Sequence, residues 1–273
     1  MGSLAQTVEQ AWARPPGVWW LLYPLEILYA GITALRRGLF RRGWLASGHP
    51  GVPVIVIGNI SIGGTGKTPA VIALARALDG RGLRCAVVSR GFGARVRAVR
   101  RVDRDSRADE VGDEPLLMAR RLCCPVYVSR DRLAAARRAH ADGAEVIVCD
   151  DGLQHYRLQR DIEVVVVDAA QGFGNGHLLP LGPLREPRRR LAVVDFLLER
   201  GGEDPGSAYR VRPRCFRSLD GRIERALDAP GFGPAVHALA AIARPERFFF
   251  FFRELGLEPV EHALADPDRA PAE

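Results

Sequence analysis

The residues best suited to chemistry form one glycine-rich segment, Ser61-Ile62-Gly63-Gly64-Thr65-Gly66-Lys67-Thr68. Glycines let successive backbone N–H groups turn toward one anion, and a helix N-terminus adds partial positive charge. The ammonium of Lys67 supplies a point charge for phosphate oxygens, and the hydroxyl of Thr68 can bind Mg²⁺. This segment, here called the phosphate loop, therefore predicts binding of nucleotide phosphates.

Composition supports this interpretation independently, because Lys67 is the single lysine among 39 lysines and arginines. A compact ammonium fits between phosphate oxygens where a broad guanidinium does not. One position departs from the common pattern, since Ser61 stands where such loops usually begin with glycine. We therefore expect a variant P-loop that binds ATP.

A pair of carboxylates, Asp150 and Asp151, follows the apolar segment 145–149. Carboxylates are ligands that Mg²⁺ accepts, and the metal that bridges nucleotide phosphates is commonly bound by a hydroxyl of the loop as well. Thr68, Asp150 and Asp151 are therefore the predicted Mg²⁺ ligands, directly or through water. The alternative is that the two aspartates form a solvated strand end.

A second acidic pair, Asp113 and Glu114, begins a predicted helix after an arginine-rich segment at residues 95–109. Phosphoryl transfer to an alcohol needs a base at the acceptor hydroxyl, and either carboxylate could serve. Acidic residues in a first helical turn also stabilise the helix by capping. The residue types alone leave both interpretations open. The arginine-rich segment is too polar to pack, and we expect a mobile flap there.

The elements that must position these groups alternate along the chain. Between several of the predicted strands, apolar residues recur at the three- and four-residue intervals of a helix. The strands are predicted from apolar, β-branched segments at residues 52–58, 85–89, 125–129, 145–151, 162–168 and 192–198. Such alternation is typical of an α/β fold with a doubly wound, mostly parallel sheet, whose ligands bind beyond the carboxyl ends of the strands. This fold would gather around one crevice the phosphate loop, Arg90, Asp150, Asp151 and the loop after Asp168.

The most apolar long segment, residues 18–35, precedes the phosphate loop, and Pro24 and Glu26 interrupt it. A basic cluster follows, formed by Arg36, Arg37, Arg41 and Arg42. Aromatic residues, an apolar face and this basic cluster favour a helix in a membrane interface beside anionic lipid. A core helix packed on the sheet is the main alternative. A spanning helix is a further one, although the segment is marginal in length for it.

The chain has 273 residues, a formal net charge of +7 and a pI near 9.6. Positive charge favours an anionic partner, and we expect an anionic lipid surface, with no nucleic acid and no obligate protein partner. The five cysteines predict neither a disulfide framework nor a zinc site. We divide the chain into a membrane-associating region (1–50), a P-loop core (51–208) and a C-terminal part (209–273).

The C-terminal part predicts a hairpin followed by a small α/β lobe. Asp220-Gly221 is a hairpin-turn dipeptide, and residues 237–243 and 246–256 predict a strand and a helix. Phenylalanine occupies every position from 248 to 252. Because that run spans more than one helical turn, some of its rings should be exposed.

Several motifs accompany the phosphate loop in order. They are residues 56–69, Ser89-Arg90-Gly91-Phe92-Gly93, Gly112-Asp113-Glu114-Pro115, residues 150–157, and residues 174–180 with 182–187. Arg244-Pro245-Glu246-Arg247-Phe248-Phe249 extends the series. The ordered set is far more specific than the loop alone, and it resembles the tetraacyldisaccharide 4'-kinase family, the lipid A 4'-kinases of Gram-negative bacteria.

The resemblance implies a peripheral enzyme at the cytoplasmic face of the bacterial inner membrane. Its reaction would transfer the γ-phosphate of ATP to the 4'-hydroxyl of a tetraacyldisaccharide 1-phosphate in lipid A biosynthesis. The resemblance also implies that Asp113 is the base and that Asp150 and Asp151 serve Mg²⁺ and the nucleotide. The residues expected to contact the acylated substrate are Arg90, Asn175, His177 and Arg185.

Two alternatives accompany this interpretation. Switch or partitioning ATPases share the Gly-Gly-x-Gly-Lys-Thr pattern, but they usually carry another lysine where this chain has Ile62. A nucleotide-binding relic with weak catalysis also fits, since relatives usually continue further and carry a histidine pair where Pro267 and Asp268 stand. We therefore expect a truncated C-terminal lobe with a frayed end at 265–273, in which His262 either partners the base or leaves it without a histidine.

Overall fold

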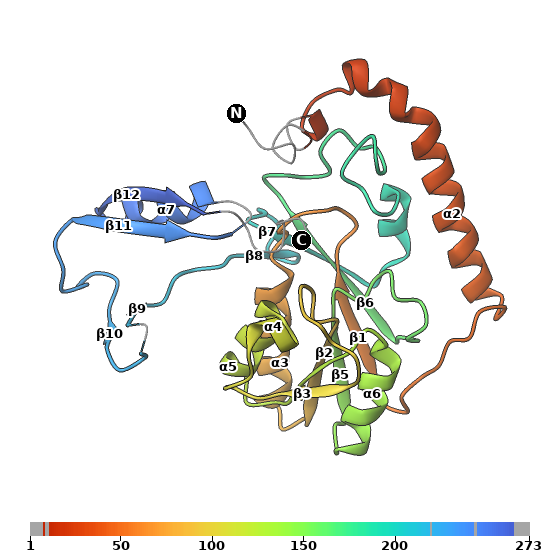
Figure 1. Cartoon of the computed structure of the whole chain (residues 1–273), viewed down its shortest axis with the longest axis horizontal. Helices are drawn as coiled ribbons and strands as arrows, with labels where there is room; N and C mark the ends of the chain where they lie inside the picture. The colour runs from red at the N-terminus through yellow and green to blue at the C-terminus, as the bar shows by residue number, and fades with distance from the viewer. Residues whose placement is uncertain (1–7, 9–10, 219, 243–244, 265–273) are drawn as a thin grey trace. The chain divides into compact units, whose positions relative to one another are not determined.

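The structure is a computed structural model that describes residues 8, 11–218, 220–242 and 245–264 (Figure 1). The chain forms two compact units, one that ends at Tyr209 and one that begins at Arg210. The first unit contains the phosphate loop and both acidic pairs, so it positions the candidate site. The frayed end predicted from the sequence lies outside the described residues.

An eight-stranded sheet in the order β3-β4-β2-β5-β1-β6-β7-β8 forms the centre of the first unit. Its strands are β1 Val54–Gly58, β2 Cys85–Ser89, β3 Arg100–Val102, β4 Val126–Val128, β5 Val146–Asp150, β6 Ile162–Asp168, β7 Phe196–Arg200 and β8 Ala208–Tyr209. Every neighbouring pair is parallel except β3 and β4. The predicted α/β class with a mostly parallel sheet is confirmed. The last predicted strand begins later than residue 192, because Arg188–Val193 forms the 3-10 helix η2.

Strand β1 lies between β5 and β6 and is parallel to both. Val56 and Ile57 point to opposite faces of the sheet, and both are buried, as expected for β-branched side chains on a strand covered on both faces. The chain leaves β1 toward β2 and later returns to β5 beside it, before it continues to β6 on the opposite side. The carboxyl end of β1 is therefore where such a sheet is expected to bind its ligand.

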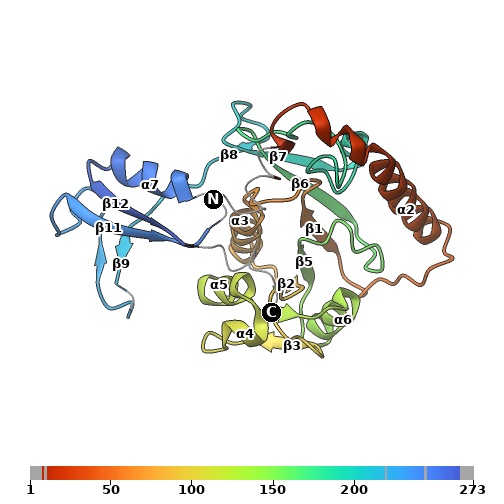
Figure 2. The same cartoon turned by 45° about the horizontal axis from the view of Figure 1, so that its top comes forward.

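Helices cover both faces of the sheet, which makes it doubly wound (Figure 2). The helices α3 (Lys67–Asp79) and α5 (Asp113–Arg121) pack on one face, where Val71 and Met118 join the apolar core. The helix α6 (Arg132–Ala141) packs on the other face. Both core clusters bury strand residues, so the sheet fixes where each strand ends and each following loop begins.

Residues 95–109 are more ordered than their polarity predicts. Arg100–Val102 forms the edge strand β3, and Ala108–Val111 forms the short helix α4. Val96 and Val102 are buried in the core cluster that contains α5. The expectation of a segment too polar to pack was wrong, because two valines among the arginines attach it to the sheet.

The N-terminal apolar segment forms the 3-10 helix η1 (Gly17–Leu22) and the α-helix α2 (Tyr23–Arg41). Pro24 lies in the first turn of α2, where its missing N–H leaves no helical bond unmade. Glu26 is only 8% exposed, and its carboxylate accepts a hydrogen bond of 2.7 Å from the backbone N–H of Leu178. The apolar segment thus changes from 3-10 helix to α-helix just before Pro24, and Glu26 anchors α2 to the loop at Leu178.

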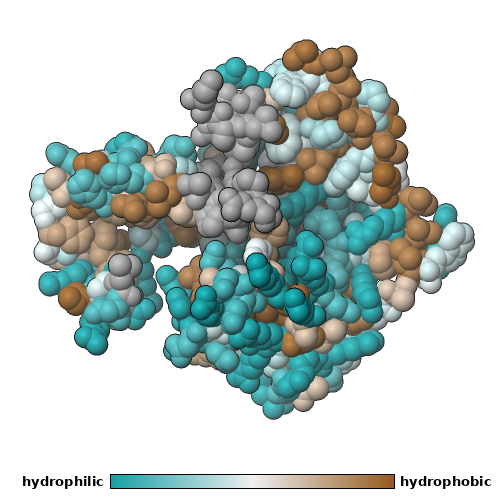
Figure 3. Space-filling view, viewed as in Figure 1, coloured by the Kyte–Doolittle hydropathy of each residue, from teal (hydrophilic) through white to brown (hydrophobic). Residues whose placement is uncertain are grey.

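Helix α2 turns its apolar side outward (Figure 3). The exposed apolar side chains that follow one another at intervals of three and four are Leu25, Leu28, Ile32 and Leu35. On the inner side, the hydroxyl of Tyr29 donates to the carbonyl oxygen of Arg185 at 3.0 Å. Only 6% of the most apolar window of this region is buried. The structure contradicts the core-helix alternative, because a helix packed on the sheet would bury its apolar side.

The second unit contains a hairpin and a small α/β element. The hairpin strands are β9 (Phe216–Arg217) and β10 (Glu224–Arg225), and the parallel strands β11 (Ala235–Ala240) and β12 (Glu258–Ala263) flank α7 (Pro245–Glu254). Within the phenylalanine run, Phe249 is buried, whereas Phe250 is 56% exposed. The predicted exposure of part of the run is confirmed.

Candidate active site

The phosphate loop connects the carboxyl end of β1 to the first turn of α3, as the sequence predicts. Gly66 has a left-handed backbone with φ of 92°, and a Cβ there would lie 2.6 Å from the hydroxyl of Tyr209. Only glycine fits this position. Ser61 has no positive φ and forms an antiparallel bridge with Leu184. The chain tolerates serine in place of the usual first glycine because the backbone there requires none.

Both side chains that begin α3 contact carboxylates from other elements. Nζ of Lys67 lies 3.6 Å from Oδ1 of Asp151, which directly follows β5. Oγ1 of Thr68 donates to Oε1 of Glu114 in α5 at 2.9 Å. These contacts bring the phosphate loop and both predicted acidic pairs to one edge of the sheet.

The adjacent aspartates at the end of β5 have opposite electrostatic environments. Burial raises the pKa of Asp150 to about 7, and the charges of Glu114 and Asp151 add to this effect. Burial also acts against ionisation of Asp151, but Lys67 and Arg185 outweigh it and lower the pKa of that carboxyl. At neutral pH, Asp150 is therefore close to its ionisation point, whereas Asp151 is ionised.

The raised pKa of Asp150 predicts how stability depends on pH in the protein without nucleotide. An unfolded aspartate releases its proton near pH 4, whereas folded Asp150 keeps it until about pH 7, so the free energy of unfolding should fall between these values. The Asp150→Asn variant lacks this titrating group. In urea denaturation, its free energy of unfolding minus that of the wild type should therefore increase as pH rises from about 4 to about 7. Asp151→Asn is the matched control and should show no such gain. An equal gain in both variants would contradict the assignment.

Oxygen ligands suited to Mg²⁺ are available at this edge. Oδ2 of Asp150 accepts a hydrogen bond of 3.1 Å from Ser89, whereas its buried Oδ1 has no hydrogen-bond partner among the described residues. The described part of the chain also lacks any group of three or more His, Cys, Asp or Glu that could hold a metal ion. Mg²⁺ usually keeps several waters and binds one or two carboxylates together with substrate phosphates. The residues present therefore fit a Mg²⁺ held jointly by Thr68, Asp150 and a nucleotide.

The two members of the acidic pair at the start of α5 have different surroundings. Glu114 is half-buried and accepts the hydroxyl proton of Thr68. Asp113 is exposed, and its carboxylate makes no hydrogen bond or ion pair within the residues that the structure describes. No side-chain hydrogen bond caps this helix, since its N-cap is Gly112. The carboxylate of Asp113 is therefore available to a substrate.

Two side chains that the sequence analysis missed hold carbonyl groups of the phosphate loop. Arg200, the last residue of β7, ion-pairs with Asp168 and donates to the carbonyl oxygen of Gly64 at 3.3 Å. The hydroxyl of Tyr209 in β8 donates to the carbonyl oxygen of Gly66 at 2.8 Å. These bonds restrict the conformations of the loop. The sequence could have indicated a site role for Arg200 only through its position at the end of a strand, because its partners Gly64 and Asp168 are remote along the chain.

Two of the predicted substrate residues lie at this edge of the sheet. Nη1 of Arg185 is 3.2 Å from Oδ2 of Asp151, so Arg185 joins the charged groups around the phosphate loop. Arg90 directly follows β2, the neighbour of β5, and its side chain is exposed. Both are placed among the groups that would meet an anionic ligand, and their contact with substrate stays a prediction.

The other two predicted substrate residues have partners within the fold, and their contact with substrate stays a prediction. The side-chain amide of Asn175 donates to the carbonyl oxygen of Leu181 at 3.0 Å, and its Oδ1 accepts the backbone N–H of His177. Nδ1 of His177 lies 3.0 Å from Oε2 of Glu26 in α2. These contacts fix the loop and attach it to the N-terminal helix. They bring neither residue to the phosphate loop.

His262 lies on β12 in the second unit. Its Nε2 is 2.9 Å from Nδ1 of His237 on β11, and the two rings stack with centroids 5.2 Å apart. Both side chains are exposed. The described contacts of His262 thus lie within its own unit, and its partnership with Asp113 stays a prediction.

Comparisons with known proteins connect this site to one family. A family model described as tetraacyldisaccharide-1-P 4'-kinase matches residues 18–269. A tetraacyldisaccharide 4'-kinase of Chromobacterium violaceum is 49% identical over an alignment of 275 residues, with 96% of this chain and 80% of the relative covered. Another, from Pseudomonas paraeruginosa, is 45% identical over 269 residues, with 97% and 81% covered.

A solved structure agrees in fold. The crystal structure of the apo form of LpxK from Aquifex aeolicus in complex with ATP has a TM-score of 0.75 and 28% sequence identity. The match covers 92% of this chain and 84% of that one. Because the family model also spans nearly the whole sequence, the chain belongs to the family of tetraacyldisaccharide-1-phosphate 4'-kinases.

Proposed function

We propose that this chain transfers the γ-phosphoryl group of ATP to the 4'-hydroxyl of a tetraacyldisaccharide 1-phosphate, a step of lipid A biosynthesis. The observation that supports it most is that the family match coincides with a suitable set of groups at one edge of the sheet. This set comprises a loop for phosphates, two differently ionised aspartates and an exposed carboxylate. A switch or partitioning ATPase needs no base for an alcohol, so the exposed acid favours the kinase.

In the proposed reaction, Lys67 and the backbone N–H groups of its loop bind the phosphates of ATP. Asp113 accepts the proton of the acceptor hydroxyl while that oxygen forms a bond to the γ-phosphorus. The bond from this phosphorus to the bridging oxygen of ADP breaks. Asp151 positions the ammonium of Lys67 through their ion pair. Thr68 and Asp150 would hold Mg²⁺, and Asp151 would contact the ion directly or through a water molecule. When bound, the ion would supply positive charge that neutralises the phosphates.

Incubation of purified protein with γ-labelled ATP and an acylated disaccharide 1-phosphate tests this function. The expected result is labelled lipid that depends on both substrates. Release of free phosphate alone would instead indicate a switch ATPase. Nucleotide binding with neither product would indicate a relic without catalysis, in which His262 does not support the base.

We also propose that α2 attaches the protein to the cytoplasmic face of the inner membrane as a peripheral anchor. By length and composition, Gly17–Arg41 could cross a membrane. However, Glu26 and Tyr29 bind the folded unit on one side, while the apolar side chains of α2 face outward. One side of α2 is hydrogen-bonded to the folded unit and the other side is apolar. Such a helix suits the interface between membrane and water better than the hydrocarbon core of the bilayer.

The basic cluster at the end of α2 should strengthen this attachment. Each arginine near an anionic surface contributes about 1 kcal/mol, so changing Arg36, Arg37, Arg41 and Arg42 to Gln should weaken binding to anionic vesicles roughly fivefold per charge. Raised salt should have the same effect on the wild type. The matched control changes four arginines of the second unit, Arg210, Arg212, Arg214 and Arg217, to Gln. Equal flotation of both variants and the wild type would contradict an electrostatic anchor.

A further inference from the structure

The glycine-rich half of the phosphate loop is held by two side chains from the last strands of the sheet. Nη2 of Arg200 in β7 donates to the carbonyl oxygen of Gly64 at 3.3 Å. The hydroxyl of Tyr209 in β8 donates to the carbonyl oxygen of Gly66 at 2.8 Å. Because glycine has no side chain to limit its backbone, such a segment loses much conformational freedom when it becomes ordered. The two bonds remove part of that freedom before a nucleotide binds.

The guanidinium of Arg200 is itself held by a buried carboxylate. It pairs with Asp168, which ends β6 and is only 1% exposed. Oδ1 of Asp168 also accepts the backbone N–H of Ala170 at 3.1 Å. The side chain of Arg200 lies directly against Gly66, where an added Cβ would be 2.7 Å from its Cδ. The guanidinium therefore has one defined position beside the loop.

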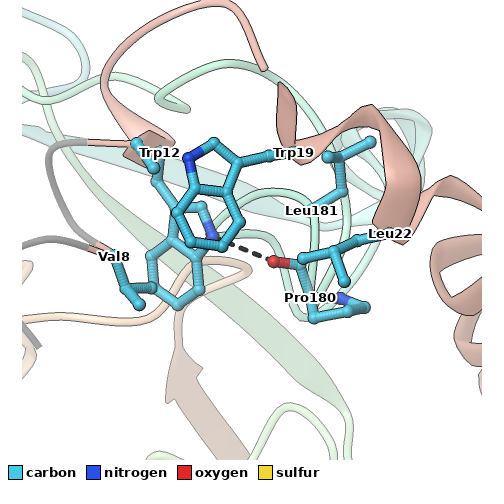
Figure 4. A pocket seen from close by; sticks show the side chains of 7 residues that line it. Val8, Trp12, Trp19, Leu22, Pro180 and Leu181 are labelled. Atoms are coloured by element: carbon cyan, nitrogen blue, oxygen red, sulfur yellow. Dashed lines mark hydrogen bonds between the residues drawn. The ribbon is translucent and has the colours of Figure 1, made fainter. Parts of the chain in front are cut away.

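The first half of the loop is held by a backbone bond instead. The N–H of Ile62 donates to the carbonyl oxygen of Pro183 at 2.8 Å. The segment that contains Pro183 is fixed in turn at Pro180, whose carbonyl oxygen accepts the indole N–H of Trp12 at 3.0 Å (Figure 4). Unlike the bond at Ile62, the two contacts in the glycine-rich half come from side chains that substitution can remove.

The carbonyl groups that these side chains bind determine where the neighbouring N–H groups point. In a trans peptide, the C=O group and the N–H of the next residue point in opposite directions. While the carbonyl of Gly66 is bound to Tyr209, the N–H of Lys67 therefore points away from Tyr209 and out of the first turn of α3. N–H groups in this direction are the donors that bind a phosphate at a helix N-terminus.

We propose that Arg200 and Tyr209 are positioning residues that set the phosphate loop in its phosphate-binding conformation before the nucleotide binds. This inference rests on the proposed function. The two residues contribute to affinity and not to the chemical step, because bound phosphates order the loop in the variants as well. Loss of either contact should therefore raise KM for ATP and leave kcat close to that of the wild type.

Calorimetric titration with tripolyphosphate and Mg²⁺ tests the loop without catalysis. Tyr209→Phe removes one hydrogen bond and should raise the Kd for tripolyphosphate and the KM for ATP by about 2- to 10-fold. Arg200→Met removes the bond to the loop and the ion pair, and it should raise both constants at least as much. Arg200→Lys keeps the positive charge without the planar fork, so it should resemble Arg200→Met.

Substitution of a buried ion pair can destabilise the fold, so the set includes a second variant. Asp168→Asn with Arg200→Met removes the charges of both partners, which avoids leaving one of them behind. It should raise the Kd for tripolyphosphate as Arg200→Met does. Tyr209→Phe loses only a hydroxyl group and keeps the test available in a folded protein.

Two matched controls remove bonds of the same kinds elsewhere in the first unit. Tyr127→Phe loses the hydroxyl bond of 2.7 Å to Asp142, and Arg84→Met loses the ion pair with Glu145 at 2.9 Å. Either change can lower the melting temperature, but the Kd for tripolyphosphate should remain that of the wild type. A purely structural role of Arg200 and Tyr209 would make their variants behave like these controls.

The outcomes separate this inference from the proposed function. Unchanged affinity for tripolyphosphate in Tyr209→Phe and in the Arg200 variants would overturn the positioning role while the kinase function stands. A lower kcat at unchanged KM would overturn it as well, and wild-type binding by Arg200→Lys would show that Arg200 acts through its charge alone. A wild type that binds no tripolyphosphate would overturn the proposed function together with this inference.

Discussion

Lys67→Arg is expected to reduce kcat/KM for ATP by about 100-fold or more, although the charge is kept. The side chain of Lys67 is 12% exposed, and its ammonium lies 3.6 Å from Oδ1 of Asp151. Arg200 and Tyr209 donate hydrogen bonds to backbone carbonyls of the same loop. A guanidinium is broader and planar, so it cannot occupy this position without displacing the loop or the aspartate. Steady-state kinetics with γ-labelled ATP measure the effect.

The control for this variant is Arg81→Lys, because the chain has no second lysine to replace. Arg81 is exposed just beyond α3, and its exchange should leave kinetics and melting temperature unchanged. A Lys67→Arg enzyme within about threefold of the wild type would correspond to less than about 1 kcal/mol of barrier. That result would exclude the phosphate loop as the site of γ-phosphate binding.

Asp113→Asn should lower kcat by roughly 10²–10⁴, the contribution of a positioned general base. The affinity for ATP should remain close to that of the wild type, because Asp113 contacts neither Lys67 nor Thr68 among the described residues. Single-turnover kinetics at saturating ATP separate the chemical step from binding. Asp109→Asn is a suitable control, since Asp109 is an exposed carboxylate that pairs with Arg107 on the surface.

A substitution of the neighbouring residue Glu114 distinguishes a base from a residue of the nucleotide site. Glu114→Gln keeps an oxygen acceptor for the Thr68 hydroxyl but removes its negative charge, so it should change the affinity for Mg²⁺ and ATP more than Asp113→Asn does. If Asp113→Asn instead raised the Kd for ATP and preserved kcat, Asp113 would belong to the nucleotide site. The proposed base would then have to be sought elsewhere.

The sequence by itself determined the architecture of the first unit and the position of the phosphate loop. Strands such as Val54–Gly58 and Val146–Asp150 are short β-branched segments, and that composition reports a strand buried on both faces. The glycines, Lys67 and Thr68 act through neighbouring backbone, so their spacing alone specifies the loop. For the acidic pairs and the other predicted site residues, the roles came from the resemblance of the ordered motifs to a known family.

Other features depended on the tertiary structure, because they arise from distances and burial across the fold. Asp150 and Asp151 are identical in type, yet burial and the charges of Lys67 and Arg185 separate their pKa values. The contact of Arg200 with the loop joins residues far apart in the chain.

The outward direction of the apolar side of α2 was likewise decided only by packing. The sequence offered an interfacial helix, a core helix and a spanning helix as alternatives. Glu26 accepts a hydrogen bond from the backbone of Leu178, and Tyr29 donates one to the backbone of Arg185, so these bonds fix which side of the helix faces the fold. A pattern along the chain encodes local conformation, but charge environments and exposed surfaces exist only once remote segments have packed together.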